Sequence, residues 1–285
     1  MASLSLVVLA AGLGRRFGGV KQLAQVGPSG EAIFDYSASD ASRAGFDRVV
    51  LVVRSEILGL VSEHVARHWP SGLDTRIVCQ DRDELGERAS ARGRAIPLGT
   101  AHAVLAGAKA AGDRPFVVIN ADDLYGSEPY RLLAAQLTRE RDCALVTFPV
   151  ANTLLGPGTV SRALCDVGAG MLRSIEEGTV TSASAGLVWQ GITGRRVTLD
   201  GSEPVSMNCW GFRPDAAVAF ADATERFVAS DRVATTDEVL IPDVVRTLAA
   251  NGVRFAALPA SGHCVGVTHA SDLDAVRQIV STPAW

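Results

Sequence analysis

Several features are scarce in this sequence of 285 residues. Aromatic residues make up only 6% of it, and the formal net charge is −4. A general nucleic-acid-binding protein would carry a surplus of basic residues, so we expect no nucleic-acid partner. One local basic loop is still enough to bind a nucleotide. Only Lys21 and Lys109 are lysines, and the other basic residues are arginines.

Cysteine motifs and long apolar runs are also missing. None of the five cysteines forms a CxxC pair, which argues against a disulfide framework or a zinc site. The first apolar run stops at Gly12, too short for a signal sequence or a membrane span. We therefore expect a cytoplasmic protein without a membrane partner.

The first half of the chain alternates between two kinds of segment. Apolar, β-branched runs of strand length occur at Leu4–Ala10, Val49–Val53, Thr75–Cys79, Phe116–Asn120 and Ala144–Phe148. Helical patterns lie between them, at Ile33–Ala44, Ser55–His68, Thr100–Ala111 and Pro129–Arg139, the last with Ser127 as its expected N-cap. This alternation predicts a mostly parallel sheet covered on both faces, with ligands at the carboxyl ends of its strands.

The second half has a different pattern. Short strand-like pieces and glycine-rich turns over Thr159–Gly211 predict an antiparallel extension. Helices are expected at Pro214–Phe227, Pro242–Ala250 and Ser271–Val280, with a strand near Arg254–Leu258. No repeat divides the chain. We expect one domain over 1–285, with a nucleotide-binding half at 1–150 and an acceptor-binding half at 151–285.

The loop after the first strand combines glycines with positive charge. It contains Gly12, Gly14, Arg15, Arg16 and Lys21. Glycines let a backbone approach phosphates closely, and arginine and lysine supply the charge. A dinucleotide-binding loop would need a third glycine where Phe17 stands, and a Walker loop would need Ser or Thr after the lysine, where Gln22 stands. The pattern therefore favours another kind of phosphate-binding loop.

This loop resembles the signature of the sugar-phosphate nucleotidyltransferases, A-A/G-G-x-G-x-R followed by K-x-L. The resemblance implies a Rossmann-like three-layer α/β/α fold of the GT-A type, with a mixed central sheet and an antiparallel extension on the acceptor side. It also implies that Arg16 and Lys21 contact the triphosphate. The other nucleotide contacts implied for the loop are Ala10, Ala11, Gly12, Gly14 and Arg15.

Two later segments match the part of this family that binds the nucleobase. Gln80 ends the third strand, where family members have a glutamine that contacts the base. Gly99 and Thr100 open a helix in a segment that resembles the family's G-x-A-x-A. A solvated loop glutamine is the competing interpretation of Gln80. We interpret His102, in the same helix start, as a packing residue.

Asp122 and Asp123 follow a buried strand directly. Carboxylates near phosphates are typical ligands of Mg²⁺, which usually takes one or two of them together with phosphate and water. The segment resembles the family's G-D-N motif, which makes Asp122 the expected metal ligand and catalytic residue. Asp123 is expected to support it or to face the acceptor.

The acceptor side departs from the family pattern. Glu176 and Glu177 match a motif E-E-K-P, but Gly178 replaces its lysine. The stretch Cys264–His269, where the family has a second metal-binding aspartate, contains no acid, and Asp272 is the nearest one. Asn208 matches a polar residue that lines the acceptor pocket. Since the acceptor phosphate must be neutralised by some cation, we choose Arg162, with Arg196 second.

The resemblance implies an enzyme of the EC 2.7.7 type that transfers a nucleotidyl group from an NTP to a sugar 1-phosphate with Mg²⁺. Three alternatives stay open: a non-sugar phosphorylated acceptor, a nucleotide-binding module without turnover, and a glycosyltransferase. The last would need a D-x-D motif, which Asp122-Asp123 does not provide. A homo-oligomer is possible for any of them.

Overall fold

The computed structural model describes residues 3–12, 20–183, 186–267 and 269–282. Its helices are α1 Ile33–Arg43, α2 Leu58–His68, α3 Glu84–Ala91, α4 Thr100–Ala111, α5 Ser127–Arg139, α6 Ala216–Ala229, α7 Ile241–Ala250 and α8 Leu273–Val280. Its strands are β1 Ser5–Leu9, β2 Arg48–Val53, β3 Asp74–Cys79, β4 Phe116–Asn120, β5 Asp123–Leu124, β6 Cys143–Pro149, β7 Gly158–Ser161, β8 Ala163–Gly168, β9 Met171–Glu176, β10 Gly178–Ala183, β11 Gly186–Gly191, β12 Arg196–Leu199, β13 Pro204–Phe212, β14 Phe255–Pro259 and β15 Val265–Gly266.

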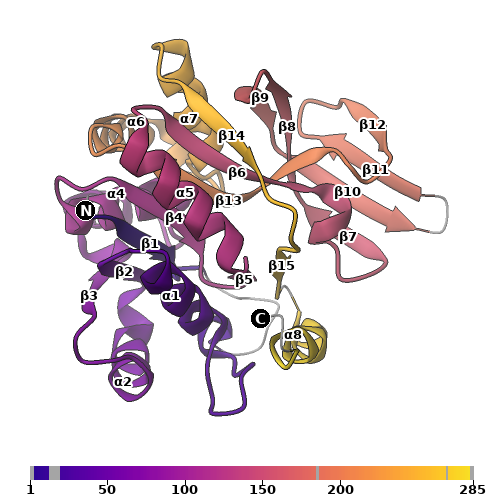
Figure 1. The fold of residues 1–285 in the computed structure, drawn as a ribbon. Coiled ribbons are helices and arrows are strands. Elements are labelled where there is room, and N and C mark those ends of the chain that lie inside the picture. Colours follow the sequence, from indigo (N-terminus) through magenta and orange to yellow (C-terminus); the bar gives the residue numbers. More distant parts are fainter. Residues whose placement is uncertain (1–2, 13–19, 184–185, 268, 283–285) are drawn as a thin grey trace.

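The central sheet has nine strands in the order β3-β2-β1-β4-β13-β6-β14-β9-β8. β1 pairs in parallel with β2 and β4, whereas β13 runs antiparallel to β4 and β6. The sheet is therefore mixed, as predicted. β13 and β14 come from the second half of the sequence but lie next to strands of the first half, so the two halves share one sheet (Figure 1).

Helices cover both faces of this sheet because its strands are apolar on both sides. In β1, Val7 and Leu9 pack into a core with α4, α6 and α7. Leu6 and Val8 point to the other face and pack with α1 and α5. This alternation gives the three layers that the sequence predicted.

The antiparallel extension is a separate sheet in the order β12-β11-β10-β7, on one side of the molecule (Figure 1). Its own small core contains Trp189 and Val180. A third pairing joins β15 to β5, which places the C-terminal stretch beside Asp123. The predicted antiparallel region is confirmed.

One local prediction was wrong, and one helix was not predicted. α5 begins at Ser127 itself, so Gly126, which has no side chain and a φ of 72°, occupies the N-cap position in place of Ser127. Helix α3 was not predicted; it is capped by Asp83, whose side chain accepts a hydrogen bond from the Gly86 N–H at 2.8 Å. Pro242 lies in the first turn of α7, as predicted.

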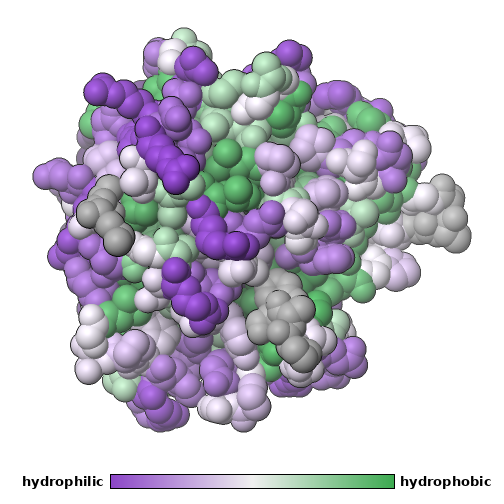
Figure 2. Space-filling view, viewed as in Figure 1, coloured by the Kyte–Doolittle hydropathy of each residue, from purple (hydrophilic) through white to green (hydrophobic). Residues whose placement is uncertain are grey.

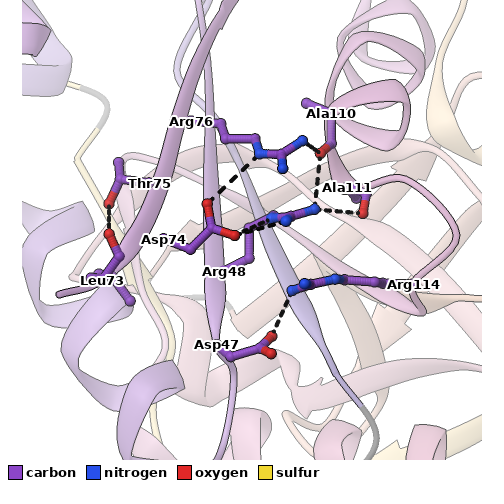
Figure 3. A network of polar contacts seen from close by, with 9 residues as sticks. All are labelled: Asp47, Arg48, Leu73, Asp74, Thr75, Arg76, Ala110, Ala111 and Arg114. Carbon is purple, nitrogen blue, oxygen red and sulfur yellow. Dashed lines mark hydrogen bonds and ion pairs between the residues drawn. The ribbon is translucent and has the colours of Figure 1, made fainter.

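A polar network fixes the amino ends of the parallel strands, opposite the edge where ligands are expected (Figure 3). Arg48, at the start of β2, contacts Asp74 at the start of β3 at 2.7 Å. Arg48 also donates to the carbonyls of Ala110 and Ala111 at the C-terminal end of α4. This hydrogen bonding by Arg48 lowers the pKa of Asp74.

The exposed large apolar side chains are scattered. Those in the described residues are Leu60, Leu155, Ile192 and Val218, from four different parts of the chain. Figure 2 shows polar residues over much of one face, with apolar ones between them. Single exposed apolar residues of this kind are ordinary. Among the described helices, none combines the length and the apolar character that a bilayer crossing needs.

Candidate active site

A cavity of about 590 Å³ opens at the carboxyl edge of the parallel strands. The residues that line it come from strand ends, from the start of α4 and from two loops. They are Leu9, Ala11, Gly12, Gln80, Ile96, Pro97, Gly99, Thr100, Ala103, Asn120, Asp122, Asn208, Thr236 and Glu238. This edge is where ligands bind in open α/β sheets.

The glycine loop begins at this cavity. Ala11 and Gly12 line it, and the Gln22 side-chain amide donates to the Gly12 carbonyl at 2.7 Å. Ala10 is completely buried behind them, and its N–H is bonded to the Val52 carbonyl. The predicted phosphate contacts Gly14, Arg15 and Arg16 lie outside the described residues.

Asp122 lines the cavity and forms an ion pair with Lys21, which is not itself a lining residue. The side chains are 14% and 32% exposed, so both remain accessible. The pair brings together the predicted phosphate-binding cation and the predicted metal ligand.

Gln80 and Gly99 both line the cavity and contact each other. The Gln80 Nε2 donates to the Gly99 carbonyl at 2.9 Å, and Gln80 is only 3% exposed. The Gln80 side chain is therefore buried in the cavity wall and fixed by a hydrogen bond, so it is not a solvated loop glutamine. Gly99 has a φ of +119°, and a Cβ there would lie 2.4 Å from the Val239 carbonyl oxygen. Thr100 Oγ1 accepts a hydrogen bond from the Ile241 N–H.

His102 does not line this cavity. It is 1% exposed, and its Nε2 lies 2.9 Å from both carboxylate oxygens of Asp83. The interpretation of His102 as a hydrogen-bonded packing residue is confirmed.

Comparison with known protein families identifies the first part of the chain. The model of the MobA-like NTP transferase domain matches residues 6–167. The chain belongs to this family. It is therefore a nucleotidyltransferase, in agreement with the resemblance seen in its glycine loop.

Solved nucleotidyltransferase structures share the fold of this transferase over almost its whole length. The inositol-1-phosphate CTP transferase from T. maritima matches with a TM-score of 0.66 and 15% identity, covering 99% of this chain and 96% of that one. A UDP-glucose pyrophosphorylase from Acinetobacter baumannii matches with a TM-score of 0.63 and 14% identity, over 97% and 92%. A UDP-glucose pyrophosphorylase in complex with UDP-glucose gives 0.63 and 16%, over 98% of both chains. A search of curated protein sequences gives no significant match.

Asp123 lies behind the cavity of the transferase. Its Oδ2 accepts from Asn120 Nδ2 at 2.7 Å, and Gly266 packs so closely that a Cβ there would meet Oδ1. Burial, and then the charge of Asp122, raises the pKa of Asp123 to about 6. A direct contact with the acceptor would require this carboxylate to leave these partners, so its acceptor role stays a prediction.

Asn208 reaches the cavity because its strand is irregular. The register of β13 against β6 shifts between Ser206 and Trp210, and Asn208 has a φ of +57°. Its side chain lies between Trp210 Nε1, at 3.3 Å, and Asn120 Oδ1, at 3.5 Å. This bulge places the predicted acceptor residue next to Asp122 on the cavity wall.

The other predicted acceptor residues do not line this cavity. Arg162 donates to Thr153 Oγ1 at 2.9 Å and to the Thr153 and Ser161 carbonyls. Glu176 pairs with Thr193 and Arg195 on the antiparallel extension. Burial, followed by the charge of Asp243, raises the pKa of Glu177, which places it near α7.

Several cavity residues had no predicted role. Asn120 could have been found, because a polar residue at the end of a buried strand marks the ligand edge of a sheet. Thr236 and Glu238 lie on an exposed segment more than 100 residues further along, where no motif singled them out. The second-choice residue, Arg196, is exposed on β12.

Proposed function

We propose that this transferase joins the nucleotidyl group of an NTP to a small phosphorylated acceptor, in the first place a sugar 1-phosphate, and releases pyrophosphate. The observation that carries the proposal is the cavity, which has the start of a glycine loop, a lysine–aspartate pair and a glutamine at the carboxyl edge of one sheet. These are groups suited to a triphosphate and a base. The acceptor would bind on the side of Asn120 and Asn208.

The reaction needs no nucleophile from the protein. An oxygen of the acceptor phosphate attacks the α-phosphorus in line, and pyrophosphate leaves. Both reactants are anions, so positioning and charge neutralisation supply most of the catalysis. We assign neutralisation to Lys21 and Arg16, and contacts with the base to Gln80 and Gly99.

Asp122 is the residue that we propose as the Mg²⁺ ligand. Its carboxylate lines the cavity and already lies against a cation, Lys21. Among the described residues there is no cluster of three or more acidic, histidine or cysteine side chains that could hold a metal. A single carboxylate fits Mg²⁺ here, because this ion commonly binds to one or two carboxylates and completes its shell with phosphates and water. When bound, the ion would act as a Lewis acid and a template.

The nature of the acceptor is supported by the solved relatives. One of them is an inositol-1-phosphate CTP transferase and two are UDP-glucose pyrophosphorylases. A phosphorylated acceptor is common to these names, which supports one for this transferase too. We keep Arg162 as the proposed cation for its phosphate; this role would require the guanidinium to release Thr153 and Ser161.

One departure from the resembling family keeps a second candidate acceptor open, a phosphorylated molecule that is not a sugar. The resembling family has a lysine where this chain has Gly178. A Cβ at Gly178 would lie 2.5 Å from the Trp189 ring and 2.6 Å from the Gln190 carbonyl oxygen. The site therefore has no space for that lysine, and the acceptor must be held differently.

The experiment that tests the proposal measures pyrophosphate from a matrix of four NTPs and of sugar 1-phosphates, inositol phosphates and other polyol phosphates, with and without a chelator. Mass spectrometry identifies the joined product. We expect pyrophosphate only when an NTP, an acceptor and Mg²⁺ are all present. NTP binding without turnover across the matrix would instead indicate a non-catalytic nucleotide-binding module.

A further inference from the structure

One buried guanidinium joins two segments that form a wall of the cavity. Arg94, just after α3, is 7% exposed. It makes six hydrogen bonds of 2.6 to 3.2 Å, and all of them end on backbone carbonyl oxygens. The acceptors are the carbonyls of Ile96, Pro97, Val233, Thr235 and Asp237. The first two belong to its own loop, and the other three lie about 140 residues away in the sequence.

The flat face of this guanidinium is also occupied. The Arg94 Cζ lies 5.2 Å from the centre of the Phe227 ring on α6. Arginine suits such a place because its planar group can stack on a ring while its edges donate in fixed directions. A lysine ammonium has only three donors and no such plane.

Both segments held by Arg94 reach the cavity. Ile96 and Pro97 line it from the first segment, and Thr236 and Glu238 line it from the second. The second segment is exposed and has no helix or strand between Ala234 and Ile241. Apart from the Arg94 bonds, it is tied to the start of α4 by hydrogen bonds between Val239 and the backbones of Leu98 and Ala101.

Glu238 lines the cavity beside Gly99, where we propose that the base binds. An added Cβ on Gly99 would lie 3.0 Å from the Glu238 Cβ, and Gly99 is the hydrogen-bond partner of Gln80. A carboxylate there would repel a triphosphate but would accept hydrogen bonds from ribose hydroxyls. The hydroxyl of Thr236, on the same segment, can donate or accept.

We infer that Arg94 is a positioning residue, which holds Thr236 and Glu238 where they contact the ribose hydroxyls of the NTP. The inference rests on the proposed function, since it takes the cavity to be the NTP site. It goes further in naming the part of the nucleotide that this wall recognises. Loss of Arg94 should loosen the wall and weaken the preference for a ribonucleotide over its 2′-deoxy form.

The test compares Arg94→Lys with wild type for an NTP and the matching 2′-dNTP. We expect the KM for the NTP to rise about tenfold or more with a smaller change in kcat, because small displacements of positioning groups have large kinetic effects. The ratio of kcat/KM for NTP over dNTP should fall toward one. Arg88→Ala is the matched control: Arg88 also links α3 to α6, but through an exposed ion pair with Glu225. It should change each constant by less than about twofold, as exposed pairs contribute little.

An unchanged KM and an unchanged ratio in folded Arg94→Lys would overturn the inference. If that variant does not fold, Glu238→Ala, at an exposed position, replaces it, because alanine removes the acceptor. An unchanged NTP/dNTP ratio there would be equally decisive against the idea. If wild type turns over no NTP, the proposed function fails by itself. Calorimetric Kd values for NTP and dNTP, in wild type and in Glu238→Ala, then decide whether this wall recognises ribose.

Discussion

The nucleotide side and the acceptor side of this transferase differ in how well their predicted residues come together. On the nucleotide side, Gly12, Gln80, Gly99 and Thr100 meet around one cavity, with Lys21 beside it. On the acceptor side only Asn208 lines that cavity. The other predicted residues have partners outside it: Arg162 binds Thr153 in the turn after β6, Glu176 binds Thr193 on the extension, and Glu177 lies near Asp243 of α7.

The difference follows from what positions each group. The nucleotide residues follow buried parallel strands or open a helix, so the sheet itself brings them to one edge. The predicted acceptor residues lie elsewhere: Glu176 ends β9 near the far edge of the central sheet, and Arg162 lies between β7 of the extension and β8. No short motif determines how these antiparallel strands pack. The comparison predicts large effects on one side and small ones on the other.

The largest effect is expected at Asp122. Asp122→Ala removes the proposed metal ligand and leaves Lys21 without its partner. We expect turnover to fall by about 10²–10³-fold, the range seen when one group that stabilises the transition state is lost. Asp222→Ala, on the exposed surface of α6, is the control and should retain normal kinetics. Full activity of Asp122→Ala would show that Asp122 is not the Mg²⁺ ligand.

The two lysines of the chain provide the next comparison. Lys21 is 14% exposed beside the cavity, whereas Lys109 is 60% exposed on α4. Lys21→Ala should lower kcat/KM for the NTP by about a hundredfold, since a charge that contacts phosphate is lost in a partly dehydrated site. Lys109→Ala should stay within about twofold of wild type. Equal effects of the two changes would show that Lys21 does not contact the triphosphate.

The next comparison uses the glycines at the two ends of α4. It distinguishes the effect of backbone strain alone from the effect of a clash in the cavity wall. Gly99 and Gly112 both have positive φ, but an added Cβ collides with Val239 only at Gly99. Gly99→Ala should destabilise the fold by about 2–4 kcal/mol and raise the KM for the NTP. Gly112→Ala has only the backbone strain and should cost about 1–3 kcal/mol, and it should leave the KM for the NTP unchanged. Thermal melts and NTP kinetics on both variants check this, and identical losses would contradict the close contact at Gly99.

The smallest effect concerns Glu177 and depends on pH. Burial and Asp243 raise its pKa in the folded protein above the unfolded value, so its carboxyl favours the neutral form. The contribution of Glu177 to the free energy of unfolding is therefore fully present at a pH below its pKa in the unfolded chain. It is lost as the pH rises through its pKa in the folded protein. Glu177→Gln should raise Tm modestly at pH 8 and leave it unchanged at pH 4. A marked rise in the KM for the acceptor, with no change in Tm at pH 8, would contradict this prediction and show that Glu177 acts in acceptor binding.

The sequence was sufficient to predict the layers of the fold and the edge that carries the site. Strand-length apolar runs predicted β1 to β4 and β6. The position of Asp122 after a buried strand, with its resemblance to the G-D-N motif, predicted that it lies at this edge. Helix α3 was missed because Glu84–Ala91 is short and mostly exposed, with only Ala89 buried, so it has little apolar periodicity.

Other parts of the site could not be predicted from local sequence patterns. Thr236 and Glu238 lie on a segment that Arg94 joins to the loop after α3 and that Val239 joins to the start of α4. Asn208 reaches the cavity through a bulge in β13, whose register depends on two neighbouring strands. Long-range hydrogen bonding of this kind leaves no periodic pattern in the sequence.

The most direct measurement of the central claim is a crystal structure of the transferase with the NTP selected by the activity matrix. The account predicts the base against Gln80 and Gly99, the ribose beside Thr236 and Glu238, and the triphosphate near Gly12, Lys21 and Asp122. A nucleotide bound at any other place, with this cavity empty, would contradict it.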